Sequence, residues 1–228
     1  MSKELIRLSN CTMSFDGEVV LDGINLYIND KEFLTLLGPS GCGKTTTLRI
    51  IGGFQTPTSG DVFFDGVRIN AVPPHKRAVN TVFQKYALFP HLNVYENVAF
   101  GLRIPKADDK GKKVKLPEKE IHQRVMEMLE VVNLKGFEKR HISQLSGGQQ
   151  QRVAIARALA SKAPIILADE PTGNLDEDTA QDIAEILKES AHKTNKCVVV
   201  VTHSNELAKQ ADIVLRLMRG KLQMEQLY

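Results

Sequence analysis

Alternating apolar and polar positions dominate the first third of the chain and predict β-strands. Runs of this kind, bounded by glycine, aspartate or asparagine, cover residues 6–13, 19–28, 33–37 and 61–67. A different spacing begins at Thr45, where apolar residues at helical intervals predict a helix directly after a glycine-rich segment. The order strand, glycine-rich loop, helix is therefore expected early in the chain.

The second half of the chain alternates between helical and strand patterns. Helices are predicted over residues 148–161 and 179–194, and strands over 164–168 and 197–201. Such alternation builds a parallel sheet. Residues 105–120 are polar and lysine-rich with two prolines, which predicts a solvated loop before an amphipathic helix over 121–134. We expect one α/β domain, with a core from residues 1–84 and 148–228 and a helical subdomain inserted over 85–147.

Composition narrows the class of protein. The 228 residues, 42% of them hydrophobic, suit one packed domain. Thirty basic and 27 acidic side chains leave a net charge of +3, which gives no reason to expect nucleic acid as a partner. No run approaches the ~20 apolar residues that cross a bilayer, and the N-terminus does not read as a signal peptide. Three cysteines without a CxxC pair suggest neither a disulfide framework nor a metal site, which fits a reducing cytoplasm.

The strongest chemical motif is a phosphate-binding loop at residues 38–45, which match G-x-x-x-x-G-K-[ST] between an apolar run and a helix. Glycines let the backbone N–H groups turn inward, and the helix N-terminus adds partial positive charge toward a bound phosphate. We expect Lys44 to reach the β- and γ-phosphates of ATP, Thr45 to ligate Mg²⁺ and Thr46 to bond a neighbouring phosphate. The residues expected to hold the nucleotide here are Ser40, Gly41, Cys42, Gly43, Lys44, Thr45 and Thr46. Cys42 is expected as a small loop residue without a redox role.

Two adjacent carboxylates follow the apolar run at residues 165–168. Asp169 is expected to hold Mg²⁺, directly or through water, while Glu170 polarises the water that attacks the γ-phosphate. Taken alone, the pair would be read as a solvated acidic turn before Pro171. Beside a phosphate loop, it predicts ATP hydrolysis rather than binding alone.

A second glycine-rich motif, Leu145-Ser-Gly-Gly-Gln149, begins the helical run QQQRVAIARALAS. Its members Ser146, Gly147, Gly148 and Gln149 offer a hydroxyl and unobstructed N–H groups to a second phosphate, although such a turn also caps a helix. With the other motifs, it makes essentially the whole chain resemble the ATPase subunits of ABC transporters. The resemblance implies a P-loop NTPase (RecA-like) core with an antiparallel β subdomain and an inserted helical subdomain. It also implies that this signature closes on ATP held by a second ATPase subunit, so a homodimer is expected.

The same resemblance assigns four further residues. Phe15 matches the aromatic residue that stacks on adenine, and Gln84 the glutamine that touches Mg²⁺ or the attacking water. His203 matches the histidine that contacts the γ-phosphate, so Glu170, His203 and Gln84 form the expected catalytic set. Asp176 matches a loop that crosses the dimer interface, although an aspartate there could equally cap the next helix. Without the resemblance, the first three would be a core phenylalanine, a loop amide and a strand-end histidine.

The resemblance differs between the two halves of the chain. The segment PPHKRAVNTVFQKYALFPHLNVYENVAFGLR is similar to polyamine-importer ATPases, whereas ADEPTGNLDEDTAQDIAEIL is closer to macrolide-export and lipoprotein-release ATPases. Spermidine or putrescine import is the expected function, with those export systems as the alternative. The expected partners are membrane-spanning permease subunits, docked at Tyr86, Phe89, Leu92 and Tyr95, and a substrate-binding protein. The chain is expected at the cytoplasmic face of the membrane, and without a C-terminal regulatory domain because it ends at Tyr228.

Two other classes of protein fit the sequence less well. ABC ATPases that act on DNA or ribosomes carry long coiled-coil insertions or two fused cassettes, and this sequence shows neither. A module that binds ATP without hydrolysing it would be expected to have lost Glu170 or His203, and both are present.

Overall fold

Two main sheets organise the computed structural model, which describes residues 3–107 and 112–224. The larger sheet comprises β3 (Phe33–Leu37), β6 (Val79–Val82), β9 (Ile165–Asp169), β10 (Cys197–Thr202), β11 (Ile213–Met218) and β12 (Lys221–Met224). Within the described residues its order is β12-β11-β3-β10-β9-β6. All neighbours pair in parallel except β12, which is antiparallel to β11.

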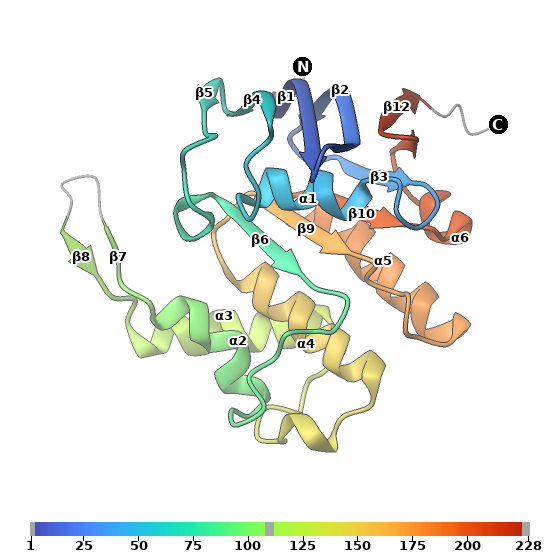
Figure 1. Cartoon of the computed structure of the whole chain (residues 1–228). Coiled ribbons are helices and arrows are strands. Elements are labelled where there is room, and N and C mark those ends of the chain that lie inside the picture. The colour runs from blue at the N-terminus through green and yellow to red at the C-terminus, as the bar shows by residue number, and fades with distance from the viewer. Residues whose placement is uncertain (1–2, 108–111, 225–228) are drawn as a thin grey trace.

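The second sheet is antiparallel, with the order β2-β1-β4-β5. Its strands are β1 (Glu4–Phe15), β2 (Glu18–Asn29), β4 (Ser59–Phe64) and β5 (Val67–Arg68). Figure 1 shows this sheet on one side of α1 (Lys44–Gly52), with the parallel sheet on the other. A separate hairpin pairs β7 (Lys106–Ala107) with β8 (Lys113–Val114) and projects from the helical region.

The remaining helices complete the layers around the parallel sheet. They are α2 (Val94–Arg103), α3 (Glu118–Val131), α4 (Gly147–Ala160), α5 (Glu177–Lys193) and α6 (Asn205–Ala208), with 3₁₀ turns at Pro74–Lys76 and Ile142–Gln144. Successive residues of a strand face opposite sides of its sheet. In β10, Val198 and Val200 accordingly join the core formed with α2 to α5, while Val199 and Val201 join the core formed with α1 and the antiparallel sheet. Both faces are buried, so the parallel strands read as continuous apolar runs.

The predicted fold class is confirmed: an α/β phosphate-loop core carries an antiparallel β subdomain and an inserted set of helices. The subdomain boundaries at residues 85 and 147 stay a prediction. Two details were wrong. The run 61–67 is not one strand, because Asp65 and Gly66 have φ angles of 49° and 74° and turn the chain between β4 and β5. Residues 105–120 are not all loop, since they contain the β7–β8 hairpin and the first turn of α3.

Arg77 fixes the end of α1 against the antiparallel side of the molecule. Its guanidinium donates to the carbonyls of Ile50 and Ile51 in the last turn of α1, and to those of Ile69 and Val72, each at 2.8 Å. These are charge-assisted bonds to backbone carbonyls, two of them in the last turn of the helix. Burial lowers the pKa of Arg77. The helix that begins at the phosphate loop is therefore held at its far end as well.

Helices of the described part of the chain are all too short or too polar to cross a membrane.

Candidate active site

The phosphate-loop motif connects β3 to α1, as the sequence predicts. Gly41 and Gly43 have φ angles of 78° and 106°, which other residues adopt only with strain. Gly38 is required for space instead, because a β-carbon there would lie 2.3 Å from the Leu217 carbonyl oxygen of β11. The first helical bond, from the Thr47 amide to the Gly43 carbonyl, is 2.9 Å long. The loop is thus fixed in a conformation that directs the N-terminus of α1 into the space above it.

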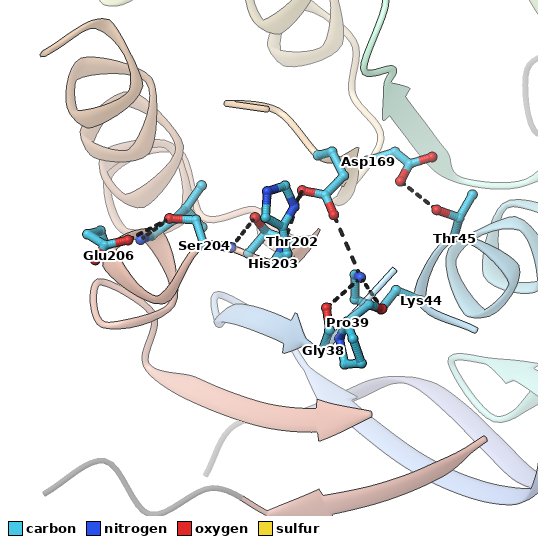
Figure 2. A network of polar contacts seen from close by, with 11 residues as sticks. Gly38, Pro39, Lys44, Thr45, Asp169, Thr202, His203, Ser204 and Glu206 are labelled. Atoms are coloured by element: carbon cyan, nitrogen blue, oxygen red, sulfur yellow. Dashed lines mark hydrogen bonds and ion pairs between the residues drawn. The ribbon is translucent and has the colours of Figure 1, made fainter. Parts of the chain in front are cut away.

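Lys44 is buried, and its ammonium group is held inside the loop. The Nζ atom donates to the carbonyl oxygens of Gly38 at 2.7 Å and Pro39 at 3.0 Å (Figure 2). It lies 3.7 Å from Glu170 Oε1. A desolvated charge interacts more strongly with a nearby anion than a charge in water does. The loop therefore presents a fixed positive charge to a phosphate.

Thr45 and Asp169 bring two oxygen atoms together at the end of β9. The Thr45 hydroxyl donates to Asp169 Oδ1 at 2.9 Å (Figure 2). Among the described residues there is no cluster of three or more histidine, cysteine, aspartate or glutamate side chains that could hold a metal ion. Mg²⁺ does not need one, since it is commonly held by one or two carboxylates together with substrate phosphates and water. A hydroxyl beside a carboxylate at a phosphate loop fits that ion.

Burial raises the pKa of Asp169 and the charge of Glu170 adds to the effect, while the Thr45 bond, Arg49 and Lys44 oppose it. The folded chain therefore keeps this proton at pH values where the unfolded chain has lost it. The free energy of unfolding then falls as the pH rises from about 3.8, the ordinary value, through the folded-state pKa. The negative charge that a metal ion needs is thus unfavourable in its absence.

Asp169→Asn should therefore make the nucleotide-free chain more stable at neutral pH, because asparagine can still accept the Thr45 bond without the buried charge. The gain should shrink as the pH is lowered. Urea unfolding from about pH 5 to about pH 8 measures this. Asp178→Asn, at an exposed position of α5, is the control and should change stability by less than about 0.5 kcal/mol. An Asp169→Asn chain less stable than wild type at neutral pH would contradict the argument.

Glu170 lies on a strained turn directly after β9. Its φ angle is 44°, in the left-handed region that a glutamate rarely adopts. The turn is held by bonds from the Glu170 amide to the Val201 carbonyl at 2.9 Å and from the fully buried Gln151 side chain to the Pro171 carbonyl at 2.8 Å. His203 Nδ1 lies 3.0 Å from Glu170 Oε2. The carboxylate is thus oriented by its own backbone and by a histidine, as an acid–base pair requires.

One cavity of about 390 Å³ collects most of the predicted residues. It is lined by Ser40, Gly41, Gly43, Lys44, Thr45, Thr46, Gln84, Glu170 and His203, together with Val20. Cys42 is buried beside Gly38 as a free thiol and is not among the residues that line the cavity. Phe15 is 40% exposed at the end of β1 and is not among the lining residues. The sequence missed Val20, which follows Phe15 across a tight turn. The turn residues Asp16-Gly17 could have predicted it, because they fold β2 back toward the phosphate loop.

The signature motif forms a separate site at the start of α4. Ser146 caps this helix: its hydroxyl accepts from the Gln149 amide, and the Gln149 side chain accepts from the Ser146 amide. None of the described residues lining the phosphate-loop cavity belongs to this motif. Asp176 likewise caps α5 by accepting from the amide and hydroxyl of Thr179, and these bonds lower its pKa. The structure therefore brings the first motif and the carboxylates together but leaves the signature and Asp176 apart from them.

The predicted docking residues are half-buried. Tyr86 and Tyr95 pack partly against the core of the helical region, and Phe89 and Leu92 are half-buried as well, so all four are less exposed than predicted, and their docking role stays a prediction. Three other phenylalanines, Phe54, Phe83 and Phe100, are more exposed, at 49%, 38% and 43%. Phe54 and Phe83 meet edge to face at 6.1 Å and line a hollow of about 270 Å³ that also reaches Asp169. These two rings were not recognised in the sequence because each ends a run that reads as core.

Comparison with known proteins places this geometry in a family. The family model described as "ABC transporter" matches residues 21–173. The spermidine/putrescine import ATP-binding protein PotA of Desulfitobacterium hafniense is 54% identical over 98% of this chain and 62% of its own length. PotA of Clostridium acetobutylicum is 51% identical over 96% and 60%. The chain thus spans about three fifths of these relatives, and the match runs through both of its halves.

Solved structures of ABC transporter proteins also resemble this chain. The dimeric structure of MJ0796, a bacterial ABC transporter cassette, is 36% identical with a TM-score of 0.83 and covers 98% of this chain and 100% of its own. A dimeric post-hydrolysis state of the same cassette, bound to ADP and Pi, gives a TM-score of 0.82. CbiO1 of Clostridium perfringens, part of an ABC transporter complex, is 28% identical with a TM-score of 0.85 over 97% of this chain and 88% of its own.

Proposed function

The chain belongs to the ABC transporter family, and from this premise we propose that it is the ATP-binding and ATP-hydrolysing subunit of a transporter. The observation that carries the proposal is the cavity where Lys44, Thr45, Gln84, Glu170 and His203 meet. A phosphate cradle alone would bind a nucleotide. A carboxylate oriented beside it by a histidine adds the means to hydrolyse one.

In this mechanism the phosphates of ATP lie on the amides of the loop and the ammonium group of Lys44. Thr45 and Asp169 would hold Mg²⁺ through their side-chain oxygens, and the ion would supply positive charge against the phosphates. Glu170 orients the attacking water and accepts its proton, while His203 holds the carboxylate in place. Gln84 borders the same cavity and completes the expected catalytic set.

The signature of a second copy is proposed to close the site. Ser146 to Gln149 lie outside the cavity of their own phosphate loop, so a phosphate that they contact belongs to another subunit. The dimeric state of the MJ0796 cassette supports this arrangement. One phosphate loop and one signature per chain then give two shared sites per dimer, with Asp176 near the interface and Phe15 against adenine.

Permease subunits are proposed to dock at the hollow lined by Phe54 and Phe83. Exposed aromatic rings of this kind mark interaction surfaces, and Asp169 lines the same hollow. A permease helix bound in this hollow lies next to Asp169, the proposed Mg²⁺ ligand. A movement of Asp169 at the site is therefore coupled to a movement of the permease helix. We place the chain on the cytoplasmic face of the membrane, with a substrate-binding protein in the assembled complex.

Polyamine import is the proposed transport function, because the relatives named above are spermidine/putrescine import proteins. Uptake of radiolabelled spermidine and putrescine should be restored when the gene is returned to a deletion strain of its own organism. A Glu170→Gln gene should fail to restore it. Normal polyamine uptake in the deletion strain, together with sensitivity to macrolides or a defect in lipoprotein release, would support the export alternative instead.

A further inference from the structure

A left-handed pair of residues follows Gln84 and turns the chain toward the signature helix. Tyr86 and Ala87 have φ angles of 58° and 47°, although neither is a glycine. Two consecutive non-glycine residues in this region persist only where the surroundings impose them. The segment is therefore held in place rather than free to relax.

Arg157 of α4 holds that segment. Its guanidinium donates to the Ala87 carbonyl at 2.8 Å and to the Tyr86 carbonyl at 3.3 Å, and it lies 5.7 Å from the centre of the Phe89 ring. Burial lowers the pKa of Arg157. The same helix that begins at the signature thus grips the two strained residues near its other end.

The Tyr86 side chain reaches the N-terminal end of that helix. A β-carbon on Gly147 would lie 2.9 Å from the Tyr86 hydroxyl oxygen and 3.8 Å from its Cζ atom. The backbone of Gly147 is not in the left-handed region, so a side chain there is disfavoured by the Tyr86 hydroxyl and not by the backbone conformation. Gly147 and Arg157 are ten residues apart, about 15 Å along the helix axis. The segment after Gln84 therefore contacts α4 at two distant points.

We propose that Tyr86 is a positioning residue for the signature. Its phenol packs against Gly147 and so fixes the start of α4 relative to the segment that carries Gln84. In the dimer, a shift of Gln84 at the nucleotide of its own chain then moves the signature of that chain, which covers the nucleotide bound by the partner. This role rests on the proposed function, because both motifs act on ATP only in a closing dimer.

The contact itself is tested by a double-mutant cycle of Gly147→Ala and Tyr86→Phe, followed by thermal unfolding without nucleotide. Gly147→Ala should lower the melting temperature in the Tyr86 chain, because the new methyl meets the hydroxyl. It should lower it much less in the Tyr86→Phe chain, where the nearest ring atom lies at an ordinary contact distance. An equal loss in both backgrounds would overturn the contact.

The positioning role is tested by light scattering in the Glu170→Gln background. Tyr86→Ala should raise the dissociation constant of the ATP-bound dimer about tenfold and leave the affinity of the monomer for Mg-ADP unchanged. Tyr95→Ala is the matched control, a second tyrosine packed on the same core whose loss should not affect the dimer. Equal weakening by both variants would reduce Tyr86 to a packing role and overturn the proposal. Absence of a dimer with Tyr86 intact would instead contradict the proposed dimer, while the melting temperatures still decide the contact.

Discussion

Glu170→Gln should reduce the turnover number of the ATPase by at least about 100-fold and leave ATP binding intact, since a positioned general base contributes about 10²–10⁴ in rate. Glutamine keeps the size of the side chain and an oxygen that can meet His203, but it cannot accept a proton from water. It also removes a negative charge 3.7 Å from the Lys44 ammonium group. ATP should therefore bind at least as tightly as in the wild type and persist.

The measurement is the solution mass of the Glu170→Gln chain by light scattering, with Mg-ATP and with Mg-ADP, beside steady-state hydrolysis. A dimer with Mg-ATP and a monomer with Mg-ADP are expected. Glu189→Gln, at a half-buried glutamate on α5 that pairs with Lys193, is the control and should hydrolyse ATP normally. Wild-type turnover by Glu170→Gln would remove Glu170 from the mechanism. A monomer under both conditions, with ATP binding confirmed, would contradict the proposed ATP-bound dimer of this chain.

Much of the fold is readable from the sequence because its strongest elements obey simple periodicities. The buried run of β3 and the glycine spacing after it locate the phosphate loop to the residue, and the apolar run of β9 delivers Asp169 to it. β6 and α2 were harder to predict because their boundaries depend on tertiary contacts. In α2, the buried Asn97 bonds the backbone of Phe89, Leu92 and Asn93. No local pattern reveals such a residue.

The sequence reveals which side chains form the site better than it reveals the contacts that hold them in position. Lys44, Thr45 and Glu170 follow from motif spacing, since a phosphate and a metal ion need those side chains in that order. The left-handed backbone at Glu170, the bond from Gln151 to Pro171 and the contact of Tyr86 with Gly147 link segments far apart in the chain. Such links depend on packing, so only the folded structure shows them.

Lys44→Ala should weaken ATP binding by at least about 30-fold, which corresponds to about 2 kcal/mol. Among the described residues that line the cavity, Lys44 is the one lysine or arginine, and its ammonium group is already desolvated against the Gly38 and Pro39 carbonyls. Removing it takes away a charge-assisted bond to the phosphates and leaves Glu170 without its nearby cation. Isothermal titration with ATP in the presence of Mg²⁺ measures the loss directly.

Lys196 offers a matched control for this prediction. It is buried to a similar degree, and its Nζ atom likewise donates to two backbone carbonyls, those of Ser161 at 2.8 Å and Ala163 at 2.6 Å. Lys44→Ala and Lys196→Ala should both lower the free energy of unfolding, because each leaves buried carbonyls without their donor. Only Lys44→Ala should change the affinity for ATP. If both variants weakened binding equally, the loss would reflect a loosened fold. If Lys44→Ala bound ATP as the wild type does, the phosphate-loop assignment would fail.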